Sequence, residues 1–255
     1  PALVTGNAIV WKPSEDAPAS AYAFVKLIQA AGVPKGVINV VFGGGKDSAG
    51  QHLIEMMDEG LVNKMAFTGS TAVGREVGAI AGRNLQHPTL ELGGKNPFVV
   101  MRDADLENAV QGAIFSSFGT GGQRCTSAGN LIIDAPVYEE FKERFLAEVR
   151  KIRIGDPGNV EDVLYGPFIN ERFYNRWAEH YEWGKADGAT LLYGEGRITA
   201  DSQPEGFEGD PDAGFYGWPT VWENVSPGMR QFQDEIFGPT INLVKVDGID
   251  EAIEV

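Results

Sequence analysis

Residues 64–83 read KMAFTGSTAVGREVGAIAGR and pass from a short apolar run, through glycine and hydroxyl residues, into a helical pattern. The run from Lys64 to Phe67 predicts a strand, and residues 71–83 predict the helix that follows. Free backbone N–H groups at the start of that helix could hold a phosphate. Ordinary capping of the helix by Ser70 or Thr71 is the alternative, and it is compatible with this role. The stretch therefore predicts one strand–turn–helix unit of an α/β protein.

The same alternation continues along the chain. Strands are predicted over residues 8–11, 37–42, 64–67, 89–92, 97–101, 130–133, 218–222 and 240–246. Helices are predicted over residues 18–31, 47–57, 71–83, 106–118, 136–151 and 171–187. Strand and helix in turn imply right-handed β-α-β units and a mostly parallel sheet. A polar stretch over 195–217 predicts an exposed loop. The Gly93-Gly94 pair divides the pattern into two expected α/β domains, residues 1–93 and 94–255.

Composition narrows the class of function. The chain has 255 residues, with 36 acidic side chains against 21 Lys and Arg and a formal charge of −15. Such a surface repels phosphate backbones and anionic lipids, so we expect neither nucleic-acid binding nor membrane binding. No apolar run approaches the ~20 residues of a spanning helix. The single cysteine excludes an internal disulfide and favours a reducing compartment such as the cytoplasm.

That cysteine, Cys125, lies within GTGGQRCTS at residues 119–127. Glycines and small hydroxyl residues around it suit the close approach of a ligand, and the neighbouring Arg124 would favour the thiolate, which is the nucleophilic form. A buried structural cysteine is the alternative. A Cys–His hydrolytic dyad also stays open, although no histidine lies near Cys125 in the sequence. The three histidines show no metal-ligand spacing, so no metal site is expected.

Two further motifs carry charged residues at strand ends. Glu91 lies in the apolar run LELGG, at the carboxyl end of a predicted strand, where α/β sheets open ligand crevices. Partial burial there would make it a usable general base, whereas a solvent-facing strand residue is the alternative. Lys12 and Glu15 follow the first strand and could bind ribose hydroxyls, or form a solvated pair. The usual dinucleotide fingerprint, G-x-G-x-x-G, is absent. No Walker A motif is present either, which argues against a P-loop triphosphatase.

Five motifs, taken in order, resemble those of the NAD(P)-dependent aldehyde dehydrogenase superfamily. They are GNAIVWKPSE at residues 6–15, FTGSTAVG at 67–74, LELGGKNP at 90–97, GQRCTSA at 122–128 and EIFGP at 235–239. The resemblance spans almost the whole chain. It implies a Rossmann-like cofactor-binding domain followed by an α/β catalytic domain, both truncated.

The resemblance also implies roles for individual residues. Cys125 matches the nucleophile that attacks the aldehyde carbon, and Glu91 matches the general base that activates water to hydrolyse the resulting thioester. The implied NAD contacts are Lys12 and Glu15 at the adenosine ribose, Gly69 and Ser70 at the pyrophosphate, and Leu92, Glu235 and Phe237 around the nicotinamide half. Glu15 would repel a 2′-phosphate, so NAD is favoured, although Lys12 could offset this and NADP stays open.

Substrate and partners follow less directly. Arg124 could pair with an anionic tail, and GQRCTSA looks closest to the branch that oxidises α-aminoadipic semialdehyde, so an aldehyde or semialdehyde is the expected substrate. The resemblance implies a homo-oligomer for the full-length chain. The family's oxyanion-hole asparagine and its C-terminal portion lie outside the 255 residues, so we expect this fragment alone to be weak or inactive.

Two other functions stay open at this point. A coenzyme-A-acylating semialdehyde dehydrogenase would use a thiol in place of water in its last step, and Glu91 argues against it because that chemistry needs no hydrolytic base. A non-catalytic nucleotide-binding relative is the other alternative. The presence of both Cys125 and Glu91 disfavours it, because a structural role requires neither residue.

Overall fold

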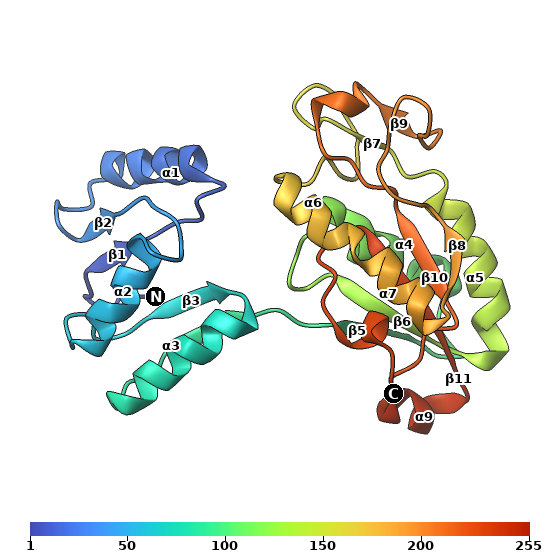
Figure 1. The fold of residues 1–255 in the computed structure, drawn as a ribbon, viewed down its shortest axis with the longest axis horizontal. Helices are drawn as coiled ribbons and strands as arrows, with labels where there is room; N and C mark the ends of the chain where they lie inside the picture. Colours follow the sequence, from blue (N-terminus) through green and yellow to red (C-terminus); the bar gives the residue numbers. More distant parts are fainter. The chain divides into compact units, whose positions relative to one another are not determined.

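The computed structural model describes residues 1–255, and the chain divides into two units, Pro1–Leu92 and Gly93–Val255 (Figure 1). The sequence places a division after Gly93, one residue further along. Both units are α/β with mostly parallel strands, which confirms the predicted fold class. No helix combines the length and the apolar character that a membrane span requires.

The first unit alternates strands and helices in the predicted order. Its elements are β1 (Ile9–Trp11), α1 (Pro18–Ala30), β2 (Ile38–Val40), α2 (Ala49–Asp58), β3 (Ala66–Gly69), α3 (Thr71–Arg83) and β4 (Thr89–Leu92). The strands form two parallel pairs, β1 with β2 and β3 with β4. In the second pair Thr68 lies opposite Glu91, so the residues that follow β3 and the end of β4 share one edge.

Packing in the first unit centres on the contact of α2 and α3 with the β3–β4 pair. Met57, Val77 and Ala81 are fully buried there. A Cβ added to Gly74 of α3 would clash with the side chain of Leu92 on β4. Glycine at this position therefore allows the helix to approach the strand closely.

The second unit is built on one larger sheet. Its elements are β5 (Asn96–Val100), α4 (Leu106–Phe118), β6 (Ala128–Asp134), α5 (Ala135–Val149), β7 (Ile154–Gly155), α6 (Glu171–Ala178), α7 (His180–Asp187), β8 (Thr190–Tyr193), β9 (Phe207–Glu208), β10 (Thr220–Glu223), α8 (Arg230–Gln233), β11 (Thr240–Val246) and α9 (Gly248–Glu254). The strand order is β5-β6-β11-β10-β8; the first four strands are parallel, and β8 is antiparallel to β10.

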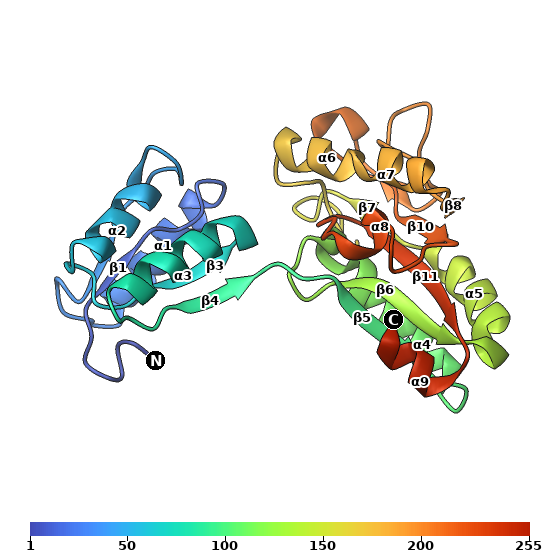
Figure 2. The same ribbon diagram turned by 60° about the horizontal axis from the view of Figure 1, so that its bottom comes forward.

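Both faces of this sheet are covered, so apolar residues of its central strands are buried on both sides. On β6, Leu131 and Ile133 face the core formed with α4 and α5, whereas Ile132 faces the core that includes Trp177 and Tyr181 of α6 and α7. Figures 1 and 2 show the helices around the sheet. The period-2 alternation of the strand thus supplies both cores.

Two details of the second unit differ from the sequence-based expectations. The helix predicted over 171–187 divides at Glu179 into α6 and α7. The stretch 195–217 is not simply an exposed loop, because it contains β9 and buries Ile198 completely and Tyr216 almost completely. These two apolar residues pack into the core with α5, which local polarity does not reveal.

The sheet of the second unit places three motifs together. The parallel strands β5, β6 and β11 begin at Asn96, Ala128 and Thr240. The segments that precede them, GGK, GQRCTS and EIFGP, therefore meet at the amino edge of the sheet.

Candidate active site

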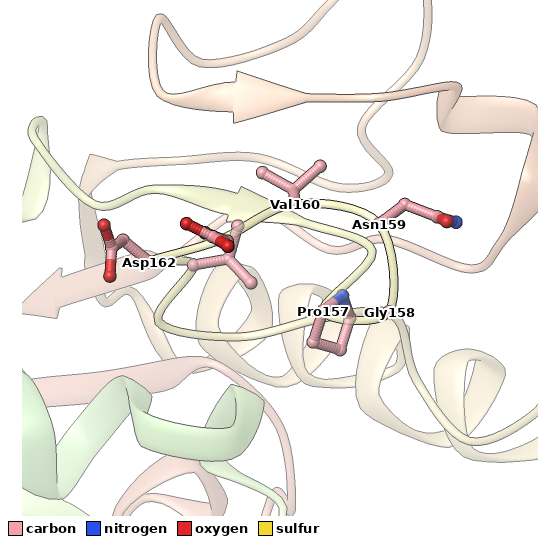
Figure 3. A pocket seen from close by; sticks show the side chains of 7 residues that line it. Pro157, Gly158, Asn159, Val160 and Asp162 are labelled. Carbon is pink, nitrogen blue, oxygen red and sulfur yellow. The ribbon is translucent and has the colours of Figure 1, made fainter.

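A small pocket at this amino edge is lined by all three motif segments. Its lining residues are Gly94, Lys95, Gly122, Arg124, Ser127, Ala128, Gly129, Glu235, Ile236, Phe237, Gly238 and Thr240. Sequence-predicted residues from distant segments, Arg124, Glu235 and Phe237, thus surround one space. A second depression is formed by the single loop Pro157–Val163, where Asp162 and Asn159 lie at opposite ends (Figure 3). It contains none of the predicted site residues.

Cys125 is exposed in a tight turn before β6. The turn follows a 3₁₀ segment over Gly119–Gly122, in which three successive residues have positive φ: 54° at Thr120, 65° at Gly121 and 63° at Gly122. A Cβ at Gly122 would clash with the carbonyl oxygen of Gly238. Glycine is therefore needed for the cysteine turn to contact EIFGP. The structural alternative of a buried cysteine is wrong.

Asn96 holds this turn from the neighbouring strand. Its Nδ2 donates to the backbone carbonyls of Cys125 at 2.7 Å and Ser127 at 2.9 Å. The turn is also closed by the Ser127 N–H, which donates to the Arg124 carbonyl at 3.0 Å. Sequence reasoning missed Asn96. The only available signal was a side-chain amide at the start of a strand, directly after GGK.

Glu235 contacts the GGK segment directly. Its carboxylate accepts the backbone N–H of Gly94, and a Cβ at Gly93 would overlap the same carboxylate. Burial raises the pKa of Glu235, while that N–H and the nearby Arg176 and Lys95 act in the opposite direction. The two glycines of LELGG thus make room for a carboxylate that comes from a different motif.

Lys95, also missed in the sequence, lies in the same pocket. Its side chain runs across Gly129, where an added Cβ would lie 2.5 Å from the lysine Cδ. Burial lowers the pKa of Lys95 to about 8, although Asp234 and Glu235 act to raise it. A cation with this pKa is partly neutral near physiological pH.

Arg124 does not extend freely into the pocket. Its Nη2 donates to the carbonyl of Phe115 at 3.0 Å, and the guanidinium lies over the Phe115 ring, 4.9 Å from the centroid. It therefore interacts with the last turn of α4. The buried Nε has no hydrogen-bond partner and remains available as a donor. Phe237 has a φ of 51°, and its ring lies 6.0 Å from that of Phe173.

In the first unit, Ser70 caps α3 as expected. Its Oγ accepts the Val73 N–H at 3.4 Å, and the N–H groups of Thr71 and Ala72 make no hydrogen bond. A Cβ at Gly69 would lie 2.6 Å from the Phe67 ring. The helix start thus presents free donors beside a glycine.

Lys12 and Glu15 lie together at another strand end. Lys12 Nζ donates to the carbonyls of Pro13 at 2.8 Å and Gly43 at 3.1 Å, and it lies 3.4 Å from a Glu15 carboxylate oxygen. The structure therefore joins WKPSE to the GGG segment after β2. Because Nζ has three donors, its present partners already use them.

Glu91 and Leu92 end β4 but differ in their surroundings. Glu91 is exposed and lies opposite Thr68 of β3, so the partial burial expected for it is absent within this unit. The Leu92 side chain packs against α3 at Gly74. The carboxyl edge of β3 and β4 thus combines an exposed carboxylate with the start of α3.

The histidines take structural or surface roles. His180 is fully buried, with Nδ1 2.5 Å from the Trp177 carbonyl and Nε2 3.3 Å from Thr240 Oγ1. Burial lowers the pKa of His180 to about 3, so the ring is neutral. His52 lies on the surface beside Glu55. No group of three or more His, Cys, Asp and Glu side chains is arranged to hold a metal ion.

Fold and site together define a two-unit α/β protein whose single cysteine lies in an open turn beside a half-buried glutamate. The model of the aldehyde dehydrogenase family matches residues 1–255. The chain belongs to the aldehyde dehydrogenase family, as its five motifs suggested.

Individual relatives support the same assignment. A betaine aldehyde dehydrogenase of Mesorhizobium japonicum is 39% identical over 254 residues, which cover 100% of this chain and 49% of that protein. A betaine aldehyde dehydrogenase of Brucella ovis is 39% identical over 253 residues, which cover 99% of this chain and 49% of that protein. The structure of a Staphylococcus aureus betaine aldehyde dehydrogenase in complex with NAD+ is similar, with a TM-score of 0.89 and 31% identity, covering 99% of this chain and 47% of that one. The chain spans about half the length of these relatives.

Proposed function

We propose that the protein containing this chain oxidises an aldehyde to a carboxylic acid with NAD(P)+, and that Cys125 is its nucleophile. The observation that carries the proposal is the exposed Cys125 thiol in a glycine-built turn, at the edge of the sheet where Glu235 and Phe237 also lie. A solvent-exposed thiol can react with a substrate, whereas a buried one is inert.

The residues present fit a dinucleotide. Gly93 and Gly94 leave space that the Glu235 carboxylate occupies, and a carboxylate is a suitable acceptor for ribose hydroxyls. The start of α3 offers free N–H groups for a pyrophosphate. Glu15 lies beside Lys12 at a strand end, and a second ribose could bind there if it replaced one of the present partners of Lys12. We assign cofactor binding to residues 1–93, with Glu235 and Phe237 added from residues 94–255.

The reaction then follows from the side chains. The Cys125 thiolate attacks the carbonyl carbon and forms a thiohemiacetal, and the backbone N–H of Cys125 can donate to the developing oxyanion. NAD(P)+, when bound, would supply the hydride acceptor, and loss of hydride from this carbon would leave a thioester on Cys125. Glu91 takes a proton from water, and the resulting hydroxide attacks the thioester. The carboxylic acid departs, and the Cys125 thiolate is restored.

We further propose that the substrate is a carboxylated semialdehyde. The buried, unpartnered Nε of Arg124 lies in the pocket beside Ser127 and could donate to an anionic tail. Betaine aldehyde, suggested by the names of the relatives, is the second candidate; its quaternary ammonium would be repelled by Arg124. We expect Arg124→Ala to raise KM for carboxylated semialdehydes much more than for neutral aliphatic aldehydes. Equal effects on both, or a preference for betaine aldehyde, would exclude the semialdehyde.

The oligomer and compartment are part of the same proposal. Similarity to a family that oligomerises supports a homo-oligomer for the whole protein, which light scattering after gel filtration would test. A nucleophilic Cys125 must stay reduced, which supports a reducing compartment such as the cytoplasm.

The central experiment uses the whole protein and a panel of aldehydes, with NADH formation followed by absorbance. Cys125→Ser should abolish turnover. Glu91→Gln should abolish steady-state turnover but keep a first-turnover burst of NADH, because only hydrolysis of the thioester is lost. A wild-type protein without activity towards any aldehyde, or a Cys125→Ser variant that retains turnover, would reject the proposal.

A further inference from the structure

The side chain of Asn96, a residue that the sequence did not indicate, makes two hydrogen bonds to the turn that carries Cys125. A single side-chain nitrogen donates to the carbonyls on both sides of the cysteine turn, at Cys125 and Ser127. We propose that Asn96 is a positioning residue for the nucleophile: its amide fixes the turn that presents the Cys125 thiol. The inference rests on the proposed function, and it assigns a role to the residue directly after GGK.

The geometry of the peptide group explains how this works. The carbonyl of Cys125 and the N–H of Thr126 belong to one planar peptide and point in opposite directions. When Asn96 holds the carbonyl, it also fixes the direction of that N–H. The N–H groups of Cys125 and Thr126 make no hydrogen bond within the chain, so they remain available beside the thiol.

The turn has little else to hold it in place. Cys125 and Thr126 are both exposed, so packing does not fix them. Thr120, which precedes the turn, has a positive φ of 54°, a conformation that is costly for a residue other than glycine. Besides the backbone bond from Ser127 to Arg124, the two bonds from Asn96 are the hydrogen bonds that close the segment.

The position of Asn96 makes it a rigid support. It is the first residue of β5, which pairs with β6, and the register of the two strands shifts between Asn96 and Pro97. This irregularity lies next to the cysteine turn, where a bulge can redirect a side chain. The amide is thus attached to the sheet, while the turn it holds is an exposed connection.

The test compares three variants at Asn96 in the whole protein. Asn96→Asp keeps the size but loses the donor, Asn96→Ala removes the side chain, and Asn96→Ser keeps one short donor. We expect kcat to fall by about 100-fold in Asn96→Asp and Asn96→Ala, the effect typical of misplacing a reacting group by about 1 Å. Asn96→Ser should be intermediate. KM for NAD+ should stay within about twofold, since uniform binding is untouched.

A second readout needs no dehydrogenase activity. Iodoacetamide alkylation is followed in the tryptic peptide Cys125–Lys142, which begins directly after Arg124. A loosened turn no longer holds the N–H groups of Cys125 and Thr126 beside the sulfur, so alkylation at neutral pH should slow by about fivefold. This readout separates failure of the positioning role from failure of the proposed function.

Asn224→Asp is the matched control. Asn224 follows β10 at the opposite edge of the same sheet, and its amide donates to Thr190 Oγ1 at 2.9 Å. Its substitution should change neither kcat nor the alkylation rate. The positioning role is refuted if Asn96→Asp and Asn96→Ala keep both the wild-type alkylation rate and kcat. It is also refuted if Asn224→Asp loses kcat and alkylation rate to the same extent as the Asn96 variants at an equal fall in thermal stability, because the losses would then follow from stability alone.

Discussion

The carboxylate of Glu235 occupies the space in which a side chain at Gly93 would lie. An ideal Cβ at Gly93 would overlap Oε2 and approach Cδ to 2.9 Å, so the two positions are mutually exclusive. The absence of a side chain at residue 93 thus allows a carboxylate from a segment more than a hundred residues away to reach the amino edge of the sheet.

Gly93→Ala should therefore displace Glu235. We expect KM for NAD+ to rise about tenfold, the effect of losing one hydrogen bond to a charged group, while Cys125 alkylation stays unchanged. Gly94→Ala is the control, because its Cβ would lie in ordinary contact, 3.5 Å from Asn96 Oδ1. Steady-state kinetics of both variants checks the prediction, and an equal rise in both would contradict it.

A second prediction concerns the turn before Cys125. Gly122→Ala should lower the free energy of unfolding by about 2–4 kcal/mol, because alanine is strained at positive φ and its Cβ would meet the Gly238 carbonyl. Gly121 also has a positive φ, but a Cβ there would meet only the flexible side chain of Gln123, 3.0 Å from its Nε2. Gly121→Ala should therefore lower the free energy of unfolding by about 1 kcal/mol. Urea unfolding measures the free energy of unfolding of both variants. A similar loss in Gly122→Ala and Gly121→Ala would show that the contact with Gly238 is unimportant.

The helices and strands that could be predicted from the sequence are those whose defining pattern lies within the element itself or directly beside it. The helix over 106–118 was predicted with its observed bounds, since Asp105 caps its start and Gly119 follows its end. The strand over 240–246, TINLVKV, was also predicted with its observed bounds, since it is rich in β-branched residues and follows the Gly-Pro turn. By contrast, β8 was missed. It is a four-residue edge strand whose pairing with β10 depends on the tertiary fold.

The site shows the same division. The sequence indicated Cys125, Glu235 and Phe237, and the structure brings their segments to one edge of a sheet. Asn96 and Lys95 could not be assigned roles, because an amide or an ammonium at a strand start is unremarkable until its neighbour is known. The partners of Asn96 lie in the turn before β6, and the acidic neighbours of Lys95 lie in the segment before β11, both distant in sequence.

A third prediction follows from the lowered pKa of Lys95. Below about pH 8 the lysine is charged in both the folded and unfolded states, and burial of the charge destabilises the fold. Between about pH 8 and the ordinary value of 10.5, the folded state loses its proton first, so this penalty disappears as pH rises. Lys95→Met keeps the packing over Gly129 and removes the charge.

We therefore expect Lys95→Met to stabilise the protein at pH 7 by on the order of 1 kcal/mol, and the gain to vanish towards pH 10. Thermal unfolding at several pH values measures it. Lys151→Met, at an exposed lysine paired with Glu148, should show no such trend. A gain for Lys95→Met that is constant with pH would mean that burial does not lower the pKa of Lys95, because stability depends on pH only where the folded and unfolded states bind different numbers of protons.

The last prediction concerns the far edge of the same sheet, where β6 ends at Asp134. Its carboxylate, with no exposed side-chain surface, accepts Arg102 Nε at 2.6 Å, Arg102 Nη2 at 3.1 Å and the Gly248 N–H at 3.1 Å. The hydrogen bond from Arg102 is the main cause that holds the pKa of Asp134 below its usual value of 3.8. A carboxyl with a lowered pKa stabilises the fold above its unfolded pKa, and this contribution is lost as pH falls through the folded value.

Asp134→Asn should therefore lower the unfolding midpoint at pH 7, and its difference from wild type should shrink as pH falls below about 4. The loss at pH 7 has two sources: the Arg102 guanidinium loses its anionic partner, and the start of α9 at Gly248 loses a charged acceptor. Asp201→Asn, at an exposed position in a turn, serves as the control and should leave the midpoint unchanged at every pH. A difference between Asp134→Asn and wild type that persists undiminished in acid would show that shape, not charge, makes Asp134 important.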